Sequence, residues 1–256
     1  MAAETMIEVR DLTIGYGERI VMENLNFTIS AGEIVCIMGG SGCGKSTLLK
    51  HLIGLYEPMK GDIFIRNRSI VTASEEEKKS IMRSFGVTYQ GGALFGSMTV
   101  AENVELPLRE YTDWPLAERM EIARKKLELV GLAGFGDYMP SELSGGMRKR
   151  AGLARALALE PDLLFFDEPS AGLDPLSSAE LDRLILSLRD DFGATVVIIT
   201  HELDSIFAIG DRGLMLDKAR RTIVADGKPE LLAKESADPW VRSFLNRGGF
   251  GHNRNL

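Results

Sequence analysis

The chain has 256 residues, of which 45% are hydrophobic, and its formal net charge is −7. This size and composition suit one large α/β domain or a core with a subdomain, and the negative charge argues against a nucleic-acid surface, whose footprint is basic. Two cysteines exclude a disulfide framework in practice, and there is no run of about eighteen apolar residues of the kind that spans a membrane. We therefore expect a cytosolic chain without nucleic-acid partners, which acts at a membrane only through another protein.

A glycine-rich loop follows an apolar run at residues 34–38 and precedes a helical pattern at residues 48–53. The loop reads Gly39, Gly40, Ser41, Gly42, Cys43, Gly44, Lys45, Ser46 and Thr47. The backbone N–H groups of such a loop point at phosphates, the lysine reaches the β and γ oxygens, and the Ser46 hydroxyl is a ligand for Mg²⁺. Because Cys43 lies inside the loop, we expect alkylation of its thiol to block nucleotide binding and bound nucleotide to protect the thiol.

Residues 91–160 indicate helices. Apolar residues recur at helical spacing after Pro115, at Leu116, Met120, Ala123, Leu127 and Val130. A second helix is predicted from about Met147 to Leu159, before Pro161. Its start carries three cations at residues 148–150, where the helix dipole disfavours positive charge. A solvated face is the favoured interpretation of this basic run, and compensation by a nucleotide on a facing subunit is the alternative.

The pentapeptide at residues 143–147 precedes that helix and has the composition of a second phosphate site. Ser144 can cap the helix, and Gly145 and Gly146 let backbone amides approach an anion closely. Taken alone, the segment is more simply an ordinary serine-capped helix after a glycine turn.

Paired acids end the apolar run at residues 163–166. Adjacent strand residues face opposite ways, so Asp167 and Glu168 can have separate tasks. We expect Asp167 to hold Mg²⁺ and Glu168 to act as general base on a water molecule, a role worth roughly 10²–10⁴ in rate. A solvated pair that opens a turn at Pro169 is the alternative.

Two further strand patterns, at residues 86–89 and 194–200, lead into Gln90 and His201. Ligands of open α/β sheets bind outside the carboxyl ends of the strands. We expect Gln90 to sense Mg²⁺ or the attacking water and His201 to hydrogen-bond the γ-phosphate. Each residue alone is more simply a capping or turn side chain, and the convergence of four strand ends favours a site. Beyond them, residues 214–227 predict a hairpin, residues 231–245 predict short helices, and the tail from Gly248 has too little apolar content to fold alone.

With these motifs in place, the chain resembles the nucleotide-binding subunit of ABC transporters over roughly residues 7–227. The resemblance implies a single domain, residues 1–256, of the α/β P-loop NTPase (RecA-like) class. Its nucleotide-binding core comprises about residues 6–90 and 161–217, with an antiparallel β subdomain. The α-helical subdomain is inserted at about residues 91–160, and the hairpin, short helices and tail occupy about residues 218–256.

The same resemblance implies ATP and Mg²⁺ as cofactors and a homodimer that shares its sites. Tyr16 corresponds to the aromatic residue that stacks on adenine, and Asp174 lies in a segment that resembles the D-loop of the family. Each ATP is then clamped between the loop at residues 39–47 of one subunit and Ser144, Gly145 and Gly146 of the other.

Residues 91–110 and Met147 resemble the Mla-type and Mce-associated ATPases of bacterial phospholipid transport. Most ABC ATPases carry glutamine at the position of Met147. The resemblance implies an ATPase on the cytoplasmic face of the bacterial inner membrane, bound to an integral-membrane permease dimer. It further implies an Mce-domain lipid-binding protein and, by analogy, a small regulatory subunit. Leu94, Phe95 and Met98 are each more often core residues, and together they favour an apolar groove rim.

Three alternatives remain open from the sequence. The cargo of the same ATPase can instead be a polar solute of the amino-acid type, and residues 90–110 favour lipid. A soluble ABC protein that acts on ribosomes or DNA usually has two cassettes or long coiled-coil insertions, and this sequence has neither. A non-hydrolysing binding module is disfavoured by the presence of Lys45, Asp167, Glu168 and His201.

Overall fold

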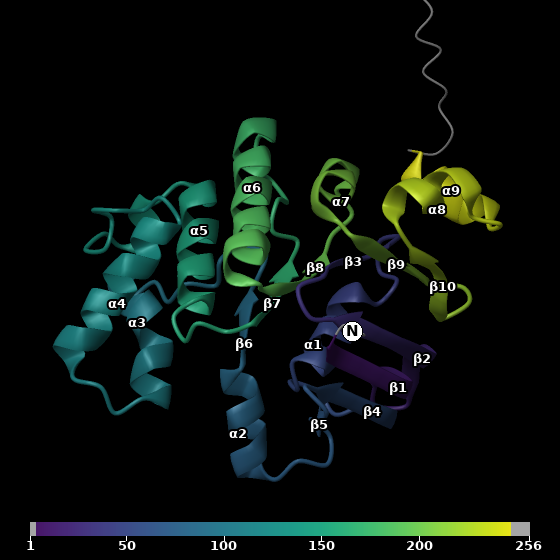
Figure 1. The fold of residues 1–256 in the computed structure, drawn as a ribbon, viewed down its shortest axis with the longest axis horizontal. Helices are drawn as coiled ribbons and strands as arrows, with labels where there is room; N and C mark the ends of the chain where they lie inside the picture. The colour runs from purple at the N-terminus through teal and green to yellow at the C-terminus, as the bar shows by residue number, and fades with distance from the viewer. Residues whose placement is uncertain (1–3, 247–256) are drawn as a thin grey trace, which may run out of the picture.

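The computed structural model describes residues 4–246, in which two β-sheets pack on opposite sides of helix α1 (Lys45–Leu52) (Figure 1). Leu48, Leu49 and Leu52 of this helix are buried with apolar side chains from both sheets. The helix therefore fixes the position of the phosphate loop, which precedes it directly. The tail from Gly248, which the sequence predicts not to fold alone, lies outside the described residues.

The larger sheet has the strand order β10-β9-β3-β8-β7-β6. Its strands are β3 (Ile34–Gly39), β6 (Phe85–Thr88), β7 (Leu163–Asp167), β8 (Thr195–Ile199), β9 (Arg212–Asp217) and β10 (Thr222–Gly227). Neighbouring strands from β9 to β6 pair in parallel, and β10 pairs antiparallel with β9 as the predicted hairpin. Because the central strands are covered on both faces, every residue of β3 and β8 is buried.

Two apolar cores lie on the two faces of this sheet, and successive strand residues alternate between them. In β7, Leu164 and Phe166 face one core, whereas Leu163 and Phe165 face the other. The alternation follows from the two-residue period of a strand. The first core includes the helical region, and the second includes α1 and the smaller sheet.

The smaller sheet is antiparallel, as expected from the sequence, with the order β2-β1-β4-β5. It consists of β1 (Thr5–Tyr16), β2 (Arg19–Ser30), β4 (Lys60–Ile65) and β5 (Arg68–Ser69). Helix α2 (Glu75–Arg83) follows, and a capping box between Ser74 and Glu77 starts it. This arrangement places Tyr16, the last residue of β1, near the phosphate loop.

The segment between β6 and β7 is helical, with α3 (Val100–Tyr111), α4 (Leu116–Leu129), a 3₁₀ turn (Pro140–Glu142) and α5 (Gly145–Ala156). The predicted helix after Pro115 is present, and it buries Ala123 and Leu127. Helix α5 begins two residues before the predicted start because the Ser144 hydroxyl accepts the N–H of Met147 and caps it there. Its last residue is Ala156 rather than Leu159.

The remaining helices are α6 (Pro175–Phe192), α7 (Leu203–Ile209), α8 (Pro229–Glu235) and α9 (Pro239–Leu245). Helices α3, α4 and α5 gather on one flank, and α8 and α9 lie beside the β9–β10 hairpin (Figure 1). The division of the chain into the predicted subdomains stays a prediction.

Candidate active site

The phosphate loop connects β3 to α1 and requires glycine where the backbone is left-handed or crowded. Gly39 and Gly44 have φ angles of +149° and +107°. A Cβ atom on Gly39 would lie 2.5 Å from the carbonyl oxygen of Leu216, and one on Gly44 would lie 2.7 Å from Val21. Such positions exclude other residues, so the glycine pattern in the sequence reports a real backbone constraint.

A cleft of about 590 Å³ lies over this loop. It is lined by every residue from Gly39 to Thr47 and by Gln90, Glu168, His201, Leu203 and Phe244. Three of the predicted strand-end residues therefore meet at the phosphate loop. The Lys45 ammonium is largely buried and donates to the carbonyl oxygens of Gly39 at 3.0 Å and Gly40 at 3.4 Å.

Asp167 reaches the loop from the end of β7. The Ser46 hydroxyl donates to Asp167 Oδ1 at 3.4 Å. Burial, and then the neighbouring charge of Glu168, raise the pKa of the Asp167 carboxyl, although Ser46, Lys50 and Lys45 oppose the shift. A cation beside this carboxylate would offset both its desolvation and the repulsion from Glu168.

The oxygen donors at Ser46 and Asp167 fit the preference of Mg²⁺ for hydroxyl and carboxylate ligands. Within residues 4–246 no group of three or more His, Cys, Asp and Glu side chains is placed to hold a metal ion. A Mg²⁺ ion at these two residues would therefore take most of its ligands from phosphate and water, as is usual for this ion.

Glu168 lies beside the cleft, with a strained backbone and a largely buried side chain. Its φ angle is +50°, a conformation that costs a residue other than glycine roughly 1–3 kcal/mol. Its N–H donates to the carbonyl of Ile199 at 2.8 Å, which ties the turn to β8. Oε1 lies 2.8 Å from His201 Nδ1, and Oε2 is buried without a hydrogen-bond partner among the described residues. The Glu168 carboxylate thus lies beside the phosphate loop with one oxygen held by His201 and the other shielded from solvent.

Tyr16 lies beside the loop, at the position expected for a base-stacking residue. Its hydroxyl is 2.9 Å from Thr47 Oγ1, and its ring meets Tyr56 edge to face with centroids 5.6 Å apart. The residue is 46% exposed, so solvent and ligands can reach it. Tyr56 was not predicted from the sequence as a neighbour of Tyr16. Its only signal there is that it is aromatic.

The glycine-rich start of α5 does not meet the phosphate cleft within one chain. Ser144, Gly146 and Met147 line a separate hollow of about 260 Å³ with residues that include Leu173 and Ser177. Asp174 caps α6 through Oδ1, which accepts the N–H groups of Leu176 and Ser177 at 3.1 and 3.0 Å. Six predicted residues are absent from the cleft lining: Tyr16, Ser144, Gly145, Gly146, Asp167 and Asp174.

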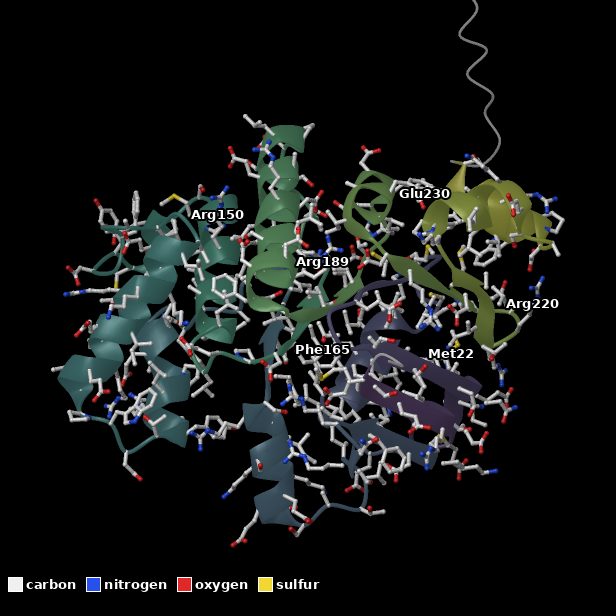
Figure 2. All side chains as sticks on the ribbon, in the orientation of Figure 1. Met22, Arg150, Phe165, Arg189, Arg220 and Glu230 are labelled. Atoms are coloured by element: carbon white, nitrogen blue, oxygen red, sulfur yellow. The ribbon has the colours of Figure 1, made fainter. Side chains whose placement is uncertain are left out.

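The basic run at the start of α5 is not the solvated face that the sequence favoured. Arg148 donates to the carbonyl of Leu143 at 2.5 Å, and Arg150 pairs with Glu180 on α6; Figure 2 shows Arg150 between the two helices. Lys149 donates to the carbonyls of Pro169, at 2.7 Å, and Ala171. The prediction was wrong because the partners are carbonyls and a carboxylate that are brought together by folding.

Cys43 also differs from the expectation of a reactive loop thiol. Its side chain is 2% exposed and belongs to the core beneath the loop. Burial raises the pKa of the thiol, although Lys45 opposes the shift. Only the backbone of Cys43 therefore remains a candidate for phosphate binding.

Comparisons with known proteins agree with this geometry. Residues 22–171 match the family model described as ABC transporter. The chain is 45% identical over 240 residues to the probable ribonucleotide transport ATP-binding protein mkl of Mycobacterium tuberculosis. The alignment covers 94% of this chain and only 66% of mkl. It is 40% identical over 241 residues to the intermembrane phospholipid transport system ATP-binding protein MlaF of Escherichia coli, covering 94% of this chain and 88% of MlaF.

Solved structures show the same fold. A dimeric ATP-binding cassette in a post-hydrolysis state, bound to ADP and phosphate, matches with a TM-score of 0.79 at 32% identity, covering 87% of this chain and 98% of that one. The cassette cbiO1 from Clostridium perfringens, part of an ABC transporter complex, matches with a TM-score of 0.81 at 27% identity, covering 95% and 97%. The chain therefore belongs to the ABC transporter family and has the α/β P-loop fold of its ATP-binding cassettes.

Proposed function

We propose that this chain hydrolyses ATP as the energy-supplying subunit of a bacterial transporter, and that two copies share two ATP molecules. One observation carries the proposal. The phosphate loop and the glycine-rich start of α5 are both suited to phosphate, yet they open onto different hollows of one chain. A second copy supplies the missing half, so each site is completed in trans.

The cleft residues divide the work between binding and proton transfer. Lys45 and the loop N–H groups bind the β- and γ-phosphates, and Tyr16 stacks on the adenine. Ser46 and Asp167, with Gln90, would hold Mg²⁺, which neutralises phosphate charge when bound. Glu168, which lines the cleft, accepts a proton from the attacking water through its carboxylate. His201 and, from the second subunit, Ser144, Gly145 and Gly146 face the γ-phosphate.

The solved relative supports the dimer, since it is a dimeric cassette bound to ADP and phosphate. Its similarity covers 87% of this chain. Closure on ATP and opening after hydrolysis follow from a nucleotide that contacts both subunits. In this proposal Asp174 caps α6 at the subunit boundary.

Mixing two inactive variants tests the shared site. Lys45→Ala damages the loop half. Gly145→Asp places a negative charge at the start of α5, where it repels the phosphates of ATP. A Cβ atom there meets only the Arg148 guanidinium, at 4.0 Å, so we expect the fold to survive. A dimer with one copy of each variant contains one intact site and one doubly damaged site. We expect each variant alone to lose ATPase activity and the mixture to regain it.

The control mixes Lys45→Ala with Glu168→Gln. Both residues line the same cleft, so no mixed dimer contains an intact site and the mixture should stay inactive. Recovery in this control, or no recovery in the first mixture, would disprove sharing between two copies.

We further propose that the cargo is phospholipid, moved between bacterial membranes. MlaF, which the chain matches over 88% of its length, is named for intermembrane phospholipid transport. The loop after Gln90 presents Phe95, which is 52% exposed, while Leu94 packs on the core. Buried Asn103 fixes this loop, because its side chain bonds the N–H of Phe95 at 2.7 Å and the carbonyls of Phe95, Met98 and Thr99.

A permease dimer is the proposed membrane partner, and it would hold this chain at the cytoplasmic face of the inner membrane. A hollow of about 250 Å³ between the nucleotide-binding core and the helical region has an apolar lining that includes Leu55, Met82 and Tyr111. It suits an apolar segment of such a partner. An Mce-domain lipid-binding protein and a small regulatory subunit complete the proposed assembly. Among residues 4–246, no helix is long and apolar enough to cross a membrane.

Transport of a polar solute is the second candidate, because the mycobacterial relative is named for ribonucleotide transport. Purification of the chain from solubilised membranes distinguishes the two. We expect a permease and an Mce-domain protein with bound phospholipid to co-purify. Reproducible recovery with an amino-acid or nucleotide permease, and without an Mce-domain protein, would reject the lipid cargo while leaving the ATPase proposal intact.

A further inference from the structure

Lys149 is the one cation of the basic run whose partners lie in the turn that follows the proposed catalytic base. Its ammonium donates to the carbonyl oxygens of Pro169 and Ala171, which follow Glu168. No carboxylate of the described residues lies within ion-pair distance of it. The side chain is half-buried, and both bonds are partly shielded from solvent. Lys149 is therefore committed to the turn and is not a surface charge.

The turn that Lys149 contacts is also tied to β8, through the bonds of Glu168 with Ile199 and His201. Glu168 has a left-handed backbone, and the N–H of Ala171 reaches the Glu168 carbonyl only at 3.3 Å. The Ser170 hydroxyl, between the two carbonyls that Lys149 binds, is buried without a partner among the described residues. A strained conformation persists only where its surroundings fix it. Lys149 supplies two such contacts from a different element.

The same helix is also joined to the segment that follows Gln90. A Cβ on Gly152 would lie 2.8 Å from the carbonyl oxygen of Gly92, so the two backbones touch. Arg155 donates to the carbonyls of Gly92 at 3.0 Å and Ala93 at 2.7 Å. Residues 149, 152 and 155 are spaced by three and lie on adjoining parts of the helix surface. Helix α5 thus contacts the segments after Gln90 and Glu168 at once.

We propose that Lys149 is a positioning residue through which α5 sets the turn of Glu168. The inference rests on the proposed function, in which the start of α5 contacts ATP on a second subunit. A displacement of α5 on that contact moves the Lys149 ammonium and, with it, the carbonyls of Pro169 and Ala171. The ATP bound to the phosphate loop of one subunit thereby affects the alignment of Glu168 in the other subunit.

Substitution at Lys149 tests this coupling in the transporter complex. Lys149→Met keeps most of the side-chain volume and removes the donor. We expect kcat for ATP to fall by about tenfold or more, because small misplacements of a catalytic group have large kinetic effects, while KM stays within about twofold. Lys149→Arg, which can still donate to both carbonyls, should recover most of kcat. Lys126→Met is the matched control, since Lys126 is also half-buried in the helical region but pairs with Glu160.

Two outcomes overturn the proposal. Parental kcat in Lys149→Met would show that the turn does not depend on the lysine. A lowered melting temperature with equal losses in kcat and affinity, and no rescue by arginine, would show a stabilising contact only.

Hydrogen exchange separates failure of this inference from failure of the proposed function. In the isolated chain, the amides of residues 168–173 should exchange about tenfold faster in Lys149→Met than in the parent, whereas those of α4 should not change. Unchanged exchange in the turn would overturn the inference even if the parent hydrolyses ATP. Faster exchange of the turn in Lys149→Met, together with a parent chain that has no ATPase activity, would instead refute the proposed function and leave the coupling of α5 to the turn established.

Discussion

His201 Nδ1 lies 2.8 Å from Glu168 Oε1, so the end of β8 fixes one oxygen of the carboxylate that follows β7. When Nδ1 of a neutral imidazole donates to the carboxylate, Nε2 carries the lone pair and is a hydrogen-bond acceptor. The second carboxylate oxygen, Oε2, is buried without a partner among the described residues. One oxygen of the Glu168 carboxylate is thus held by His201, and the other is shielded from solvent.

Glu168→Gln should nearly abolish turnover and preserve ATP binding. The amide keeps the shape of the side chain but is not a base, so we expect kcat to fall by roughly 10²–10⁴. ATP should then accumulate in a dimer, which size-exclusion chromatography with nucleotide analysis measures. Glu202→Gln is the matched control, because Glu202 lies 3.8 Å from the other side of the same imidazole. Parental hydrolysis in Glu168→Gln would show that another group is the base.

Tyr16→Ala should weaken ATP binding through loss of stacking. Removal of an aromatic platform costs about 1–3 kcal/mol, or roughly fivefold to 150-fold in Kd. Tyr16→Phe keeps the ring and loses only the contact with Thr47, so its Kd should stay within about threefold of the parent. Equilibrium titration with ATP measures both, and tripolyphosphate, which has no base, should bind all three proteins equally. An equal loss for tripolyphosphate would mean that Tyr16 acts on the loop and not on the base.

The two cysteines should react slowly with thiol reagents in the folded protein, with or without ATP. Cys36 and Cys43 are both buried, and burial raises the pKa of Cys36 to about 12 and that of Cys43 in the same direction. The thiolate is the reactive form, so labelling of the folded protein with a maleimide should be slow. After unfolding, both thiols should react, and each chain should take up two equivalents of maleimide. Rapid labelling of Cys43 that ATP prevents would restore the expectation from the sequence and contradict the buried position.

Asp182→Asn should make the protein less sensitive to rising pH. Asp182 on α6 is buried, which raises the pKa of its carboxyl, and the donated hydrogen bond from Ser205 at 3.0 Å only partly opposes the shift. The folded state therefore binds this proton more tightly than the unfolded state. Its contribution to stability is complete below the unfolded pKa and is lost as pH rises through the folded value.

We expect the difference in free energy of unfolding, Asp182→Asn minus parent, to increase with pH above about 4 and then to level off. Urea unfolding between pH 4 and 8 measures this difference. Asp190→Asn, an exposed carboxylate on the same helix, is the control and should show little change. A difference that is constant with pH would show that Asp182 titrates alike in the folded and unfolded states.

Most of the nucleotide site could be predicted from the sequence because its determinants are local. The left-handed angles at Gly39 and Gly44 allow only glycine there, and the Ser144 cap requires a serine directly before the helix. Strands that are parallel in one sheet end at the same edge. Gln90, Glu168 and His201 therefore had to meet once the sheet was recognised, and all three line the cleft.

What the sequence by itself determined was this local chemistry: a phosphate loop, polar residues at strand ends, a capped glycine-rich helix start, and membership in a family. The tertiary structure decided which side chains are free and which are held. In the folded chain the Cys43 side chain is buried in the core, Tyr56 contacts Tyr16, and Lys149 donates to carbonyls that follow Glu168. These partners belong to segments that are distant along the chain. A residue's own backbone angle and capping preference are short-range properties, whereas burial and hydrogen-bond partners exist only after the segments have packed together.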